Sequence, residues 1–263
     1  MGIKEISKAL CPPMLWKWLR RGRELRFYGD FPDWAGAVSA SGTTYASPVI
    51  LERAVHAAGE VISGRAAFER DTMCFANPEY NFPFVAAVAS VRPELVIDIG
   101  GGLGSTFFQH RKFLAHIDYR VVEQPGFVEA GNALNVPGLR FFETVAEALS
   151  DGAVPDLAVF ASVLGYLENP GAVLSETVEH GAYAIFIDRT LFASAARIAV
   201  EAIPASLGGV SYPVRIMVEE QLFAALDRKY EKMFDFAALE GKIRLHSPDG
   251  EAASRGFLWR KVR

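Results

Sequence analysis

The sequence predicts an α/β fold with a doubly wound, mostly parallel sheet and an N-terminal helical extension. From residue 91 onward, short apolar runs alternate with stretches of helical periodicity, which is the pattern of strands joined by crossover helices. These runs are apolar throughout rather than at every second residue, as expected for strands covered on both faces. A glycine-rich loop follows the first run and opens a helical stretch, so it lies where such sheets bind ligands.

Seven strands make up the expected sheet. They are residues 95–99, 119–122, 139–142, 157–162, 183–187, 230–236 and 257–262. The expected helices are residues 105–115, 126–134, 170–180 and 218–228. In a parallel sheet the carboxyl ends of the strands meet at one edge, and we expect the ligand site there.

Residues 1–90 are expected to form the N-terminal helical extension, and residues 91–263 the main domain. The extension begins with a basic helical segment at residues 1–29, which also contains Trp16 and Trp18. A basic helix with exposed tryptophans would make weak contact with an anionic membrane surface. In the alternative, the two indole rings pack on the body of the protein and the charges are solvated.

Charge is distributed unevenly along the chain. Residues 1–26 hold seven Lys or Arg and two Glu, a net charge of +5, which leaves −9 for residues 27–263 of a chain whose total is −4. Nucleic-acid binding needs a basic surface. The acidic body therefore argues against a nucleic-acid partner.

Cysteine and histidine usage indicates neither disulfides nor a metal site. Cys11 and Cys74 form no CxxC pair, and the five histidines are scattered, so zinc-type ligand spacing is absent. No apolar stretch is long enough for a membrane span, and no secretory signal is recognisable. A cytoplasmic location is expected.

The glycine-rich loop, Asp98-Ile99-Gly100-Gly101-Gly102-Leu103-Gly104-Ser105, is the most informative motif. Glycines allow a tight turn and close approach of a ligand to the backbone. A dinucleotide fingerprint would need a glycine where Ser105 stands, which argues against a nicotinamide-dependent oxidoreductase. The D-x-G-x-G-x-G pattern resembles the first motif of class I methyltransferases. This resemblance implies S-adenosylmethionine as cofactor, in contact with Asp98, Gly100, Gly101, Gly102 and Gly104.

Residues at the ends of the next strands complete the expected cofactor site. Glu123 follows the second strand, 19 residues after Gly104, and a carboxylate there accepts hydrogen bonds from two ribose hydroxyls; Gln124 is placed beside it. Glu143, after the third strand, would accept from the adenine amine or favour a helix N-terminus. Ser162 and Tyr166 follow the fourth strand as cleft residues for cofactor and substrate, or else as a strand cap and an aromatic residue at the core edge.

The whole chain resembles a narrower group, a bacterial methyltransferase family first described from Leptospira. The resemblance covers residues 27–236 and is carried by residues 31–34, 68–71, 98–105, 107–114, 122–125, 162–167, 187–190 and 211–213. It implies a Rossmann-like class I methyltransferase fold whose last strand is antiparallel, and transfer of a methyl group to a small molecule. Members are often associated with surface-polysaccharide biosynthesis, so a sugar or sugar-nucleotide acceptor is a hypothesis.

Asp188 is the preferred candidate for a general base, because it ends the fifth strand at the functional edge; alternatively it only caps a helix. His110, one turn into the first helix, is the second candidate. Arg189 and Tyr212 are candidate substrate contacts, and an arginine at the cleft would hold a phosphate or carboxylate. The alternative for Arg189 is a structural network with Asp188 and Glu69. A noncatalytic cofactor-binding or assembly protein with the same fold also stays open.

Overall fold

The computed structural model describes residues 26–42, 47–203, 209–224, 226 and 229–262. The chain divides into two compact units. Of the described residues, the larger unit comprises 47–197, 215–224, 226, 229–243 and 251–262, and the smaller one comprises 26–42, 198–203, 209–214 and 244–250. The predicted basic segment, residues 1–29, lies outside the described residues except for residues 26–29.

The sheet of the larger unit has the predicted doubly wound topology. Its strands stand in the order β6-β5-β4-β7-β8-β12-β11. Their bounds are β4 Leu95–Ile99, β5 Asp118–Val122, β6 Leu139–Phe142, β7 Leu157–Ala161, β8 Ala184–Phe192, β11 Tyr230–His246 and β12 Gly250–Lys261. Strands β4 to β8 pair in parallel, and β12 is antiparallel to β8. This is the Rossmann-like arrangement expected from the sequence, with its switch point between β4 and β7.

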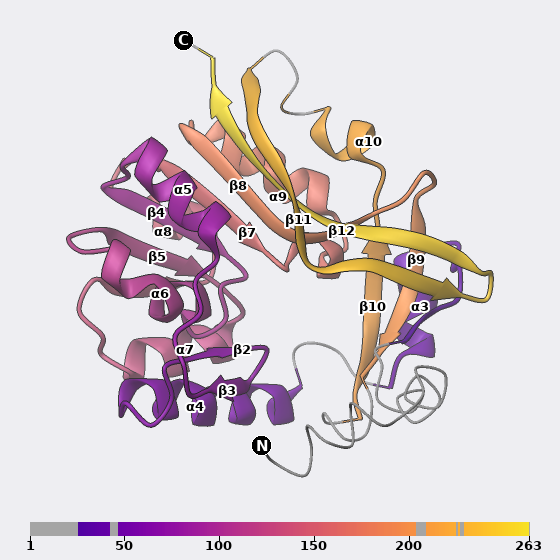
Figure 1. Ribbon diagram of the computed structural model, residues 1–263, viewed down its shortest axis with the longest axis horizontal. Helices are drawn as coiled ribbons and strands as arrows, with labels where there is room; N and C mark the ends of the chain where they lie inside the picture. The colour runs from indigo at the N-terminus through magenta and orange to yellow at the C-terminus, as the bar shows by residue number, and fades with distance from the viewer. Residues whose placement is uncertain (1–25, 43–46, 204–208, 225, 227–228, 263) are drawn as a thin grey trace, which may run out of the picture. The chain divides into compact units, whose positions relative to one another are not determined.

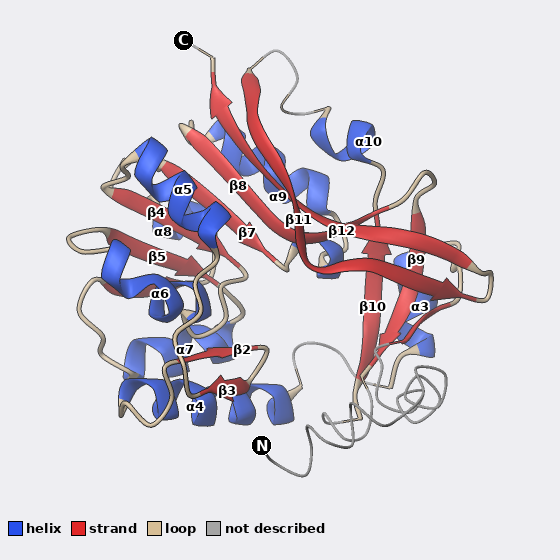
Figure 2. Cartoon of the chain, in the orientation of Figure 1, coloured by secondary structure: helices blue, strands red, loops and turns tan. Residues whose placement is uncertain are grey.

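Helices cover both faces of this sheet, as Figure 2 shows by colour. They are α4 Pro48–Ile62, α5 Phe82–Val91, α6 Ser105–His110, α7 Pro125–Ala133, α8 Val145–Ala148, α9 Pro170–Glu179 and α10 Glu219–Phe223, with short 3₁₀ turns η1 Arg111–Phe113 and η2 Leu164–Tyr166. Ile97 packs in one apolar cluster with Leu174 of α9, and its neighbour Val96 packs in another with Phe84 of α5 and Phe108 of α6. Burial on both faces explains why these strands are mostly apolar on both faces rather than at every second residue.

A two-stranded hairpin precedes the sheet in a region that was expected to be mostly helical. Strands β2 Phe68–Arg70 and β3 Met73–Phe75 pair antiparallel, and β2 packs against α6. Three-residue strands are too short to show a period of two, so the helical periodicity of α4 dominated this region. The expected helix 105–115 also differs, because its regular α-helical part ends at His110 and continues as η1.

The smaller unit adds strands that the sequence did not predict. It holds α3 Trp34–Ala40 and three strands, β1 Arg26–Tyr28, β9 Arg197–Ala202 and β10 Ser211–Ile216. Strand β1 pairs in parallel with the far end of β11 and antiparallel with β9, and the order there is β10-β9-β1-β11. With these, the described sheet has ten strands instead of the expected seven.

The observed units differ from the expected boundary at residue 90. Residues 47–91, with α4, the β2–β3 hairpin and α5, belong to the larger unit together with the sheet. The last expected helix, 218–228, is described as helical only over α10, Glu219–Phe223.

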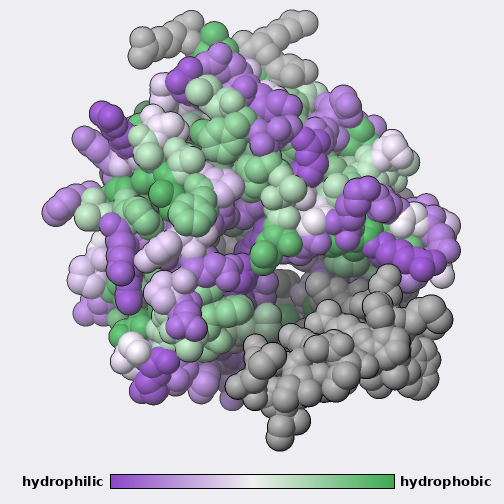
Figure 3. All heavy atoms as spheres, in the orientation of Figure 1, coloured by the Kyte–Doolittle hydropathy of each residue, from purple (hydrophilic) through white to green (hydrophobic). Residues whose placement is uncertain are grey.

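No helix among the described residues has both the length and the apolar character needed to cross a membrane. On the face seen in Figure 3, hydrophilic and hydrophobic residues are interspersed.

The close contact between α7 and β6 requires a glycine at position 131, and this can be tested. A Cβ at Gly131 would lie 2.6 Å from the ring of Phe141, whereas a Cβ at Gly171 of α9 would meet nothing closer than 3.9 Å. We expect Gly131→Ala to lower the free energy of unfolding by about 1–3 kcal/mol through overpacking, despite its better helix propensity. Gly171→Ala, the matched control, should leave it unchanged or slightly higher. Equal urea unfolding curves for the two variants would contradict this packing.

Candidate functional site at the carboxyl ends of the strands

The glycine loop leaves one position open. Gly100, Gly102 and Gly104 all have positive φ angles, of 68°, 58° and 91°, a conformation that only glycine adopts without strain. A Cβ would lie 2.3 Å from Val163 at Gly100, 2.6 Å from Asp98 at Gly101 and 2.8 Å from Leu139 at Gly104. At Gly102 the nearest atom to a Cβ would be Ser105 Oγ, at 3.7 Å. Gly102 is therefore the point of the loop where a ligand has room to approach.

Asp98 lies beneath this loop and is completely buried. Tyr119 Oη donates to its Oδ2 at 2.7 Å, but its Oδ1 has no hydrogen-bond partner among the described residues. Burial, together with the charge of nearby Glu123, raises the pKa of Asp98 to about 7, although the Tyr119 hydrogen bond opposes this. A buried oxygen without a donor is costly, and this suggests that the region is completed by a bound group.

Glu123 faces the glycine loop from the end of β5. Its carboxylate accepts the backbone N–H of Gln124 at 2.7 Å, and the backbone N–H of Gly102 is near enough to lower its pKa. Burial raises its pKa, and these two N–H groups oppose the rise. The carboxylate is thus held directly beside the open position at Gly102.

The other predicted cofactor contacts are arranged differently. The Glu143 residue is exposed after β6, and its backbone N–H donates to Glu147 in the cap of α8. Ser162 has a left-handed φ of 61° and donates its N–H to the carbonyl of Asp188. These contacts tie Ser162 to the edge of β8, but they do not by themselves indicate a ligand.

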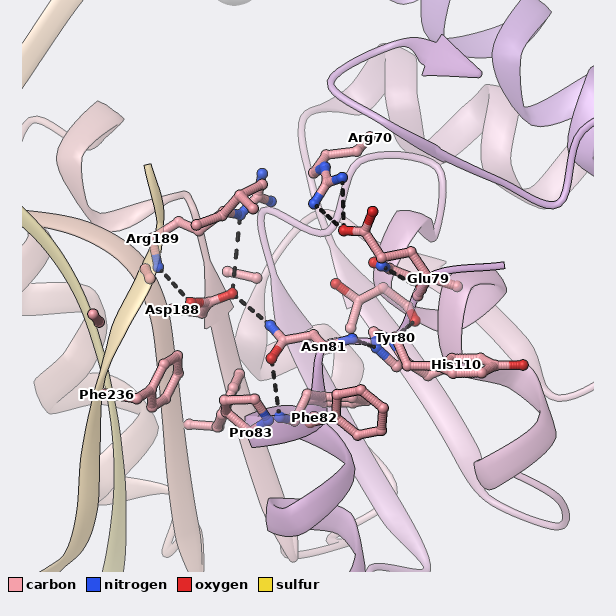
Figure 4. A pocket seen from close by; sticks show the side chains of 18 residues that line it. Arg70, Glu79, Tyr80, Asn81, Phe82, Pro83, His110, Asp188, Arg189 and Phe236 are labelled. Carbon is pink, nitrogen blue, oxygen red and sulfur yellow. Dashed lines mark hydrogen bonds and ion pairs between the residues drawn. The ribbon is translucent and has the colours of Figure 1, made fainter. Parts of the chain in front are cut away.

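A cavity of about 250 Å³ lies beside the site, within the larger unit (Figure 4). Side chains from α5, α6, β8 and β11 line it, including the predicted residues His110, Asp188 and Arg189. The aromatic rings of Phe84, Phe186 and Phe236 are also part of the lining. The cavity therefore combines an apolar wall with a small number of polar groups, the usual character of a small-molecule site.

Asp188 occupies a bulge in β8. Opposite it on β12 the register jumps, so that Asp188 and Arg189 together face the single residue Gly256. A Cβ at Gly256 would lie 2.0 Å from the ring of Phe236, which makes glycine necessary there. Bulges of this kind redirect side chains and recur beside active sites. The sequence analysis had Asp188 just beyond the end of a strand, whereas β8 runs on to Phe192.

The Asp188 carboxylate is almost fully buried and held at both oxygens. Asn81 Nδ2 donates to Oδ2 at 2.7 Å, and the backbone N–H of Arg189 donates to Oδ1 at 2.8 Å. Burial raises the pKa of Asp188, while Arg189 and Asn81 oppose the rise. A carboxylate with a raised pKa that borders a cavity is suited to accept a proton.

His110 is held in place rather than free to act as a base. Its Nε2 accepts the backbone N–H of Asn81 at 2.9 Å, so its Nδ1 carries the proton and donates to the carbonyl of Thr106 at 2.9 Å. Burial lowers the pKa of His110 to about 4. With both ring nitrogens engaged, the geometry favours a supporting role over the catalytic role predicted for it.

Two arginines stand at the same cavity. Arg189 pairs with Asp71 at 3.2 Å and lies 4.0 Å from Asp188, and Tyr166 is among the groups that raise its pKa. Arg70 pairs with Glu79 at 3.1 Å. Both guanidinium groups are mostly buried, whereas Asp71 and Glu79 are exposed. Tyr212 lies on β10 in the smaller unit, and its predicted substrate contact stays a prediction.

Asn81 was not among the site residues predicted from the sequence. This residue caps α5 by accepting the N–H of Phe84 and also links Asp188 to His110. The signal was present, because an asparagine before Phe82-Pro83 is a typical helix start with proline in the first turn. Among the described residues, no cluster of His, Cys, Asp or Glu could hold a metal ion.

No protein-family model and no curated protein matches the sequence. Among solved structures, the N-terminal domain of EvdMO1, studied in the presence of S-adenosylhomocysteine and D-fucose, is 13% identical with a TM-score of 0.49, over 83% of this chain and 98% of that one. The 1,6-didemethyltoxoflavin-N1-methyltransferase of Burkholderia thailandensis is 17% identical with a TM-score of 0.46, over 84% and 93%. Magnesium protoporphyrin IX methyltransferase of Synechocystis PCC 6803 is 13% identical with a TM-score of 0.45, over 100% and 98%. Identities this low say nothing about the ligands of this chain.

The burial of Asp98 predicts a pH-dependent stability. Because its pKa of about 7 in the folded protein exceeds that of the unfolded chain, the folded state binds more protons, and Asp98 lowers the stability as pH rises from about 4 to 7. Asp98→Asn removes this contribution. Relative to the wild type, the variant should therefore become more stable as the pH rises. We expect its unfolding free energy minus that of the wild type to increase by about 2–4 kcal/mol between pH 4 and pH 8. Urea titrations that show a constant difference would contradict the raised pKa.

Proposed function

We propose that the protein is an S-adenosylmethionine-dependent methyltransferase that acts on a small-molecule acceptor. The observation that carries this proposal is the open position at Gly102 directly beside the Glu123 carboxylate, at the switch point of a class I methyltransferase sheet. A nucleoside that lies over Gly102 brings its ribose hydroxyls to Glu123. The remaining glycines of the loop pack against the protein itself, so only this point is left open for the ligand.

The polar groups around the loop are suited to bind S-adenosylmethionine. Glu123 would hold the ribose, with Gln124 beside it, and the backbone of Gly100 to Gly104 would follow the chain that joins ribose to methionine. Glu143, next along the sheet edge, would reach the adenine amine. The unpartnered Oδ1 of Asp98 lies below the loop, where a positively charged ligand is favoured electrostatically. The described residues offer carboxylates and no cluster of cations here, which suits a sulfonium better than a pyrophosphate.

The cavity beside the loop is our candidate acceptor site. S-adenosylmethionine would supply an electrophilic methyl group, so the protein mainly has to orient and desolvate the acceptor. Asp188 would take the proton of an acceptor hydroxyl, with Asn81 and the Arg189 N–H holding its carboxylate in place. Tyr166 and Arg189 would contact the acceptor. A buried base next to a cavity favours an enzyme over a noncatalytic assembly protein.

The size of the cavity bears on the acceptor. A volume of about 250 Å³ corresponds to about eight water molecules, which is enough for a group the size of one sugar ring. Arg189 and Arg70 would hold an anionic substituent such as a phosphate. We therefore extend the proposal to a sugar or sugar-nucleotide hydroxyl as the acceptor, in line with the family resemblance. A cytoplasmic location and a role in polysaccharide biosynthesis remain predictions, as does membrane contact by the basic N-terminus.

Cofactor binding tests the proposal without knowledge of the acceptor. We expect S-adenosylhomocysteine to bind the wild-type chain in calorimetry. Glu123→Ala should weaken this binding about 10- to 150-fold, because hydrogen bonds to a charged group contribute about 1.5–3 kcal/mol. Glu129→Ala, which removes an exposed carboxylate from α7, is the control and should bind normally. If Glu123→Ala binds S-adenosylhomocysteine as tightly as the wild type, Glu123 does not contact the cofactor.

The open position at Gly102 can be tested by substitution. Gly102→Ala places a methyl group where the ligand is expected and should weaken S-adenosylhomocysteine binding at least about 10-fold. Gly152→Ala is a matched control, because Gly152 also has a positive φ, 77°, and a Cβ there meets nothing within 4 Å. Both variants carry the same backbone strain of about 1–2 kcal/mol. If both bind equally well, Gly102 does not contact the ligand.

Asp188 can be separated from cofactor binding. Asp188→Asn keeps the shape of the side chain and removes its capacity as a base. Turnover against a panel of sugar and sugar-nucleotide acceptors should fall about 10²- to 10⁴-fold, while the affinity for S-adenosylhomocysteine stays within about 3-fold of wild type. Wild-type turnover in Asp188→Asn would reject its role as base.

A further inference from the structure

The turn of the β2–β3 hairpin is strained without a glycine. Its two central residues, Asp71 and Thr72, have φ angles of 51° and 66°, where hairpins usually place Asn-Gly. A left-handed conformation costs an ordinary residue about 1–2 kcal/mol, and a β-branched threonine is an outlier there. Such strain persists only where other contacts offset it, and it concentrates at functional sites.

Each of the two turn residues has a contact that offsets the strain, and one of these contacts is with Glu69. The N–H of Thr72 donates to Glu69 Oε2 at 3.0 Å, and Asp71 pairs with Arg189. Ser105 Oγ donates to the other carboxylate oxygen of Glu69. Because Ser105 directly follows Gly104 as the first residue of α6, the hairpin holds the Glu69 carboxylate against the end of the glycine loop.

Glu69 is buried without a matching cation. Its exposed fraction is 7%, and burial raises its pKa. Arg189 lies close enough to oppose this rise, yet its guanidinium pairs with Asp71 instead. In the described part of the chain, no Lys or Arg forms an ion pair with Glu69. A buried carboxylate is costly unless it is paired, and a carboxylate with two bound donors can accept further ones.

A second buried acid, Asp98, also contacts the glycine loop. The Oδ1 of Asp98 is completely buried and has no partner, and Asp98 contacts the loop at Gly101. Two acidic side chains therefore flank the loop, one from the hairpin and one from β4, and neither is neutralised by a basic residue at ion-pair distance. This arrangement favours a ligand that brings its own positive charge.

We propose that Glu69 binds the α-ammonium group of the amino-acid part of the cofactor, so that the β2–β3 hairpin recognises this end of the ligand. The proposal rests on the function proposed above. It divides the recognition of the ligand into two parts. Glu123 recognises the ribose from β5, and Glu69 recognises the ammonium group from the hairpin. The two parts are separable, because nucleosides with and without the amino group can be compared.

The test compares two ligands by calorimetry on the full chain. One is S-adenosylhomocysteine, and the other is 5′-S-(3-carboxypropyl)-5′-thioadenosine, which lacks only the α-amino group. The wild type should bind S-adenosylhomocysteine about 10- to 100-fold more tightly, as expected for a charge-assisted hydrogen bond. In Glu69→Gln this preference should shrink to within about 3-fold, because S-adenosylhomocysteine is weakened and the deamino ligand is not. Glu60→Gln, which changes a partly buried acid on α4 that pairs with Arg65, is the control and should keep the wild-type preference.

The outcomes separate the two proposals. If the wild type binds neither ligand, the proposed function itself fails. If it binds both equally well, or if Glu69→Gln keeps the wild-type preference, the function stands and the role of Glu69 is rejected. If Glu69→Gln does not fold, the wild-type comparison still decides the need for the amino group. Glu69→Asp, which keeps the charge but shortens its reach, then takes the place of Glu69→Gln and should lose most of the preference.

Discussion

The parallel pairing of β4, β5, β7 and β8 is the constraint on which the site depends. Its register places Ile99 beside Val122 and Ala161 beside Asp188, so the residues that follow these strands meet at one edge. Glu123 reaches the glycine loop because β5 and β4 end together, and Ser162 contacts Asp188 because β7 and β8 do. A shift of one residue in either pair would turn these side chains to the opposite face of the sheet.

The site buries four acidic side chains, and each is held differently. Asp98 has one tyrosine hydroxyl, Glu123 the backbone N–H of Gln124, Asp188 an asparagine and a backbone N–H, and Glu69 a serine and a backbone N–H. Burial raises the pKa of all four. The neighbouring arginines are engaged mainly with exposed acids. Such a distribution of charge costs stability in the absence of a ligand and is compensated when a cationic one binds.

Much of this arrangement was predictable from sequence, for identifiable reasons. The strands β4 to β8 are mostly apolar runs, and the Asp98 to Ser105 motif is local, so both were recognisable. The bulge at Asp188 was not, because it arises from pairing with Gly256, which lies 68 residues further along the chain. Asn81 was not assigned, and Glu69 was expected only as a member of a structural network with Arg189, since their contacts are with partners 29 to 107 residues away. Strands β1 and β9 follow no clear period, and β10 contains Pro213, a residue that is rare inside strands.

That proline has a further consequence. Strand β10 stands at one end of the described strand order and β6 at the other. A proline cannot donate to a β-ladder, and β6 is only four residues long. Short strands and prolines are the means by which proteins keep the outer strands of a sheet from pairing with those of another molecule. Both outer strands are thereby protected against edge-to-edge aggregation.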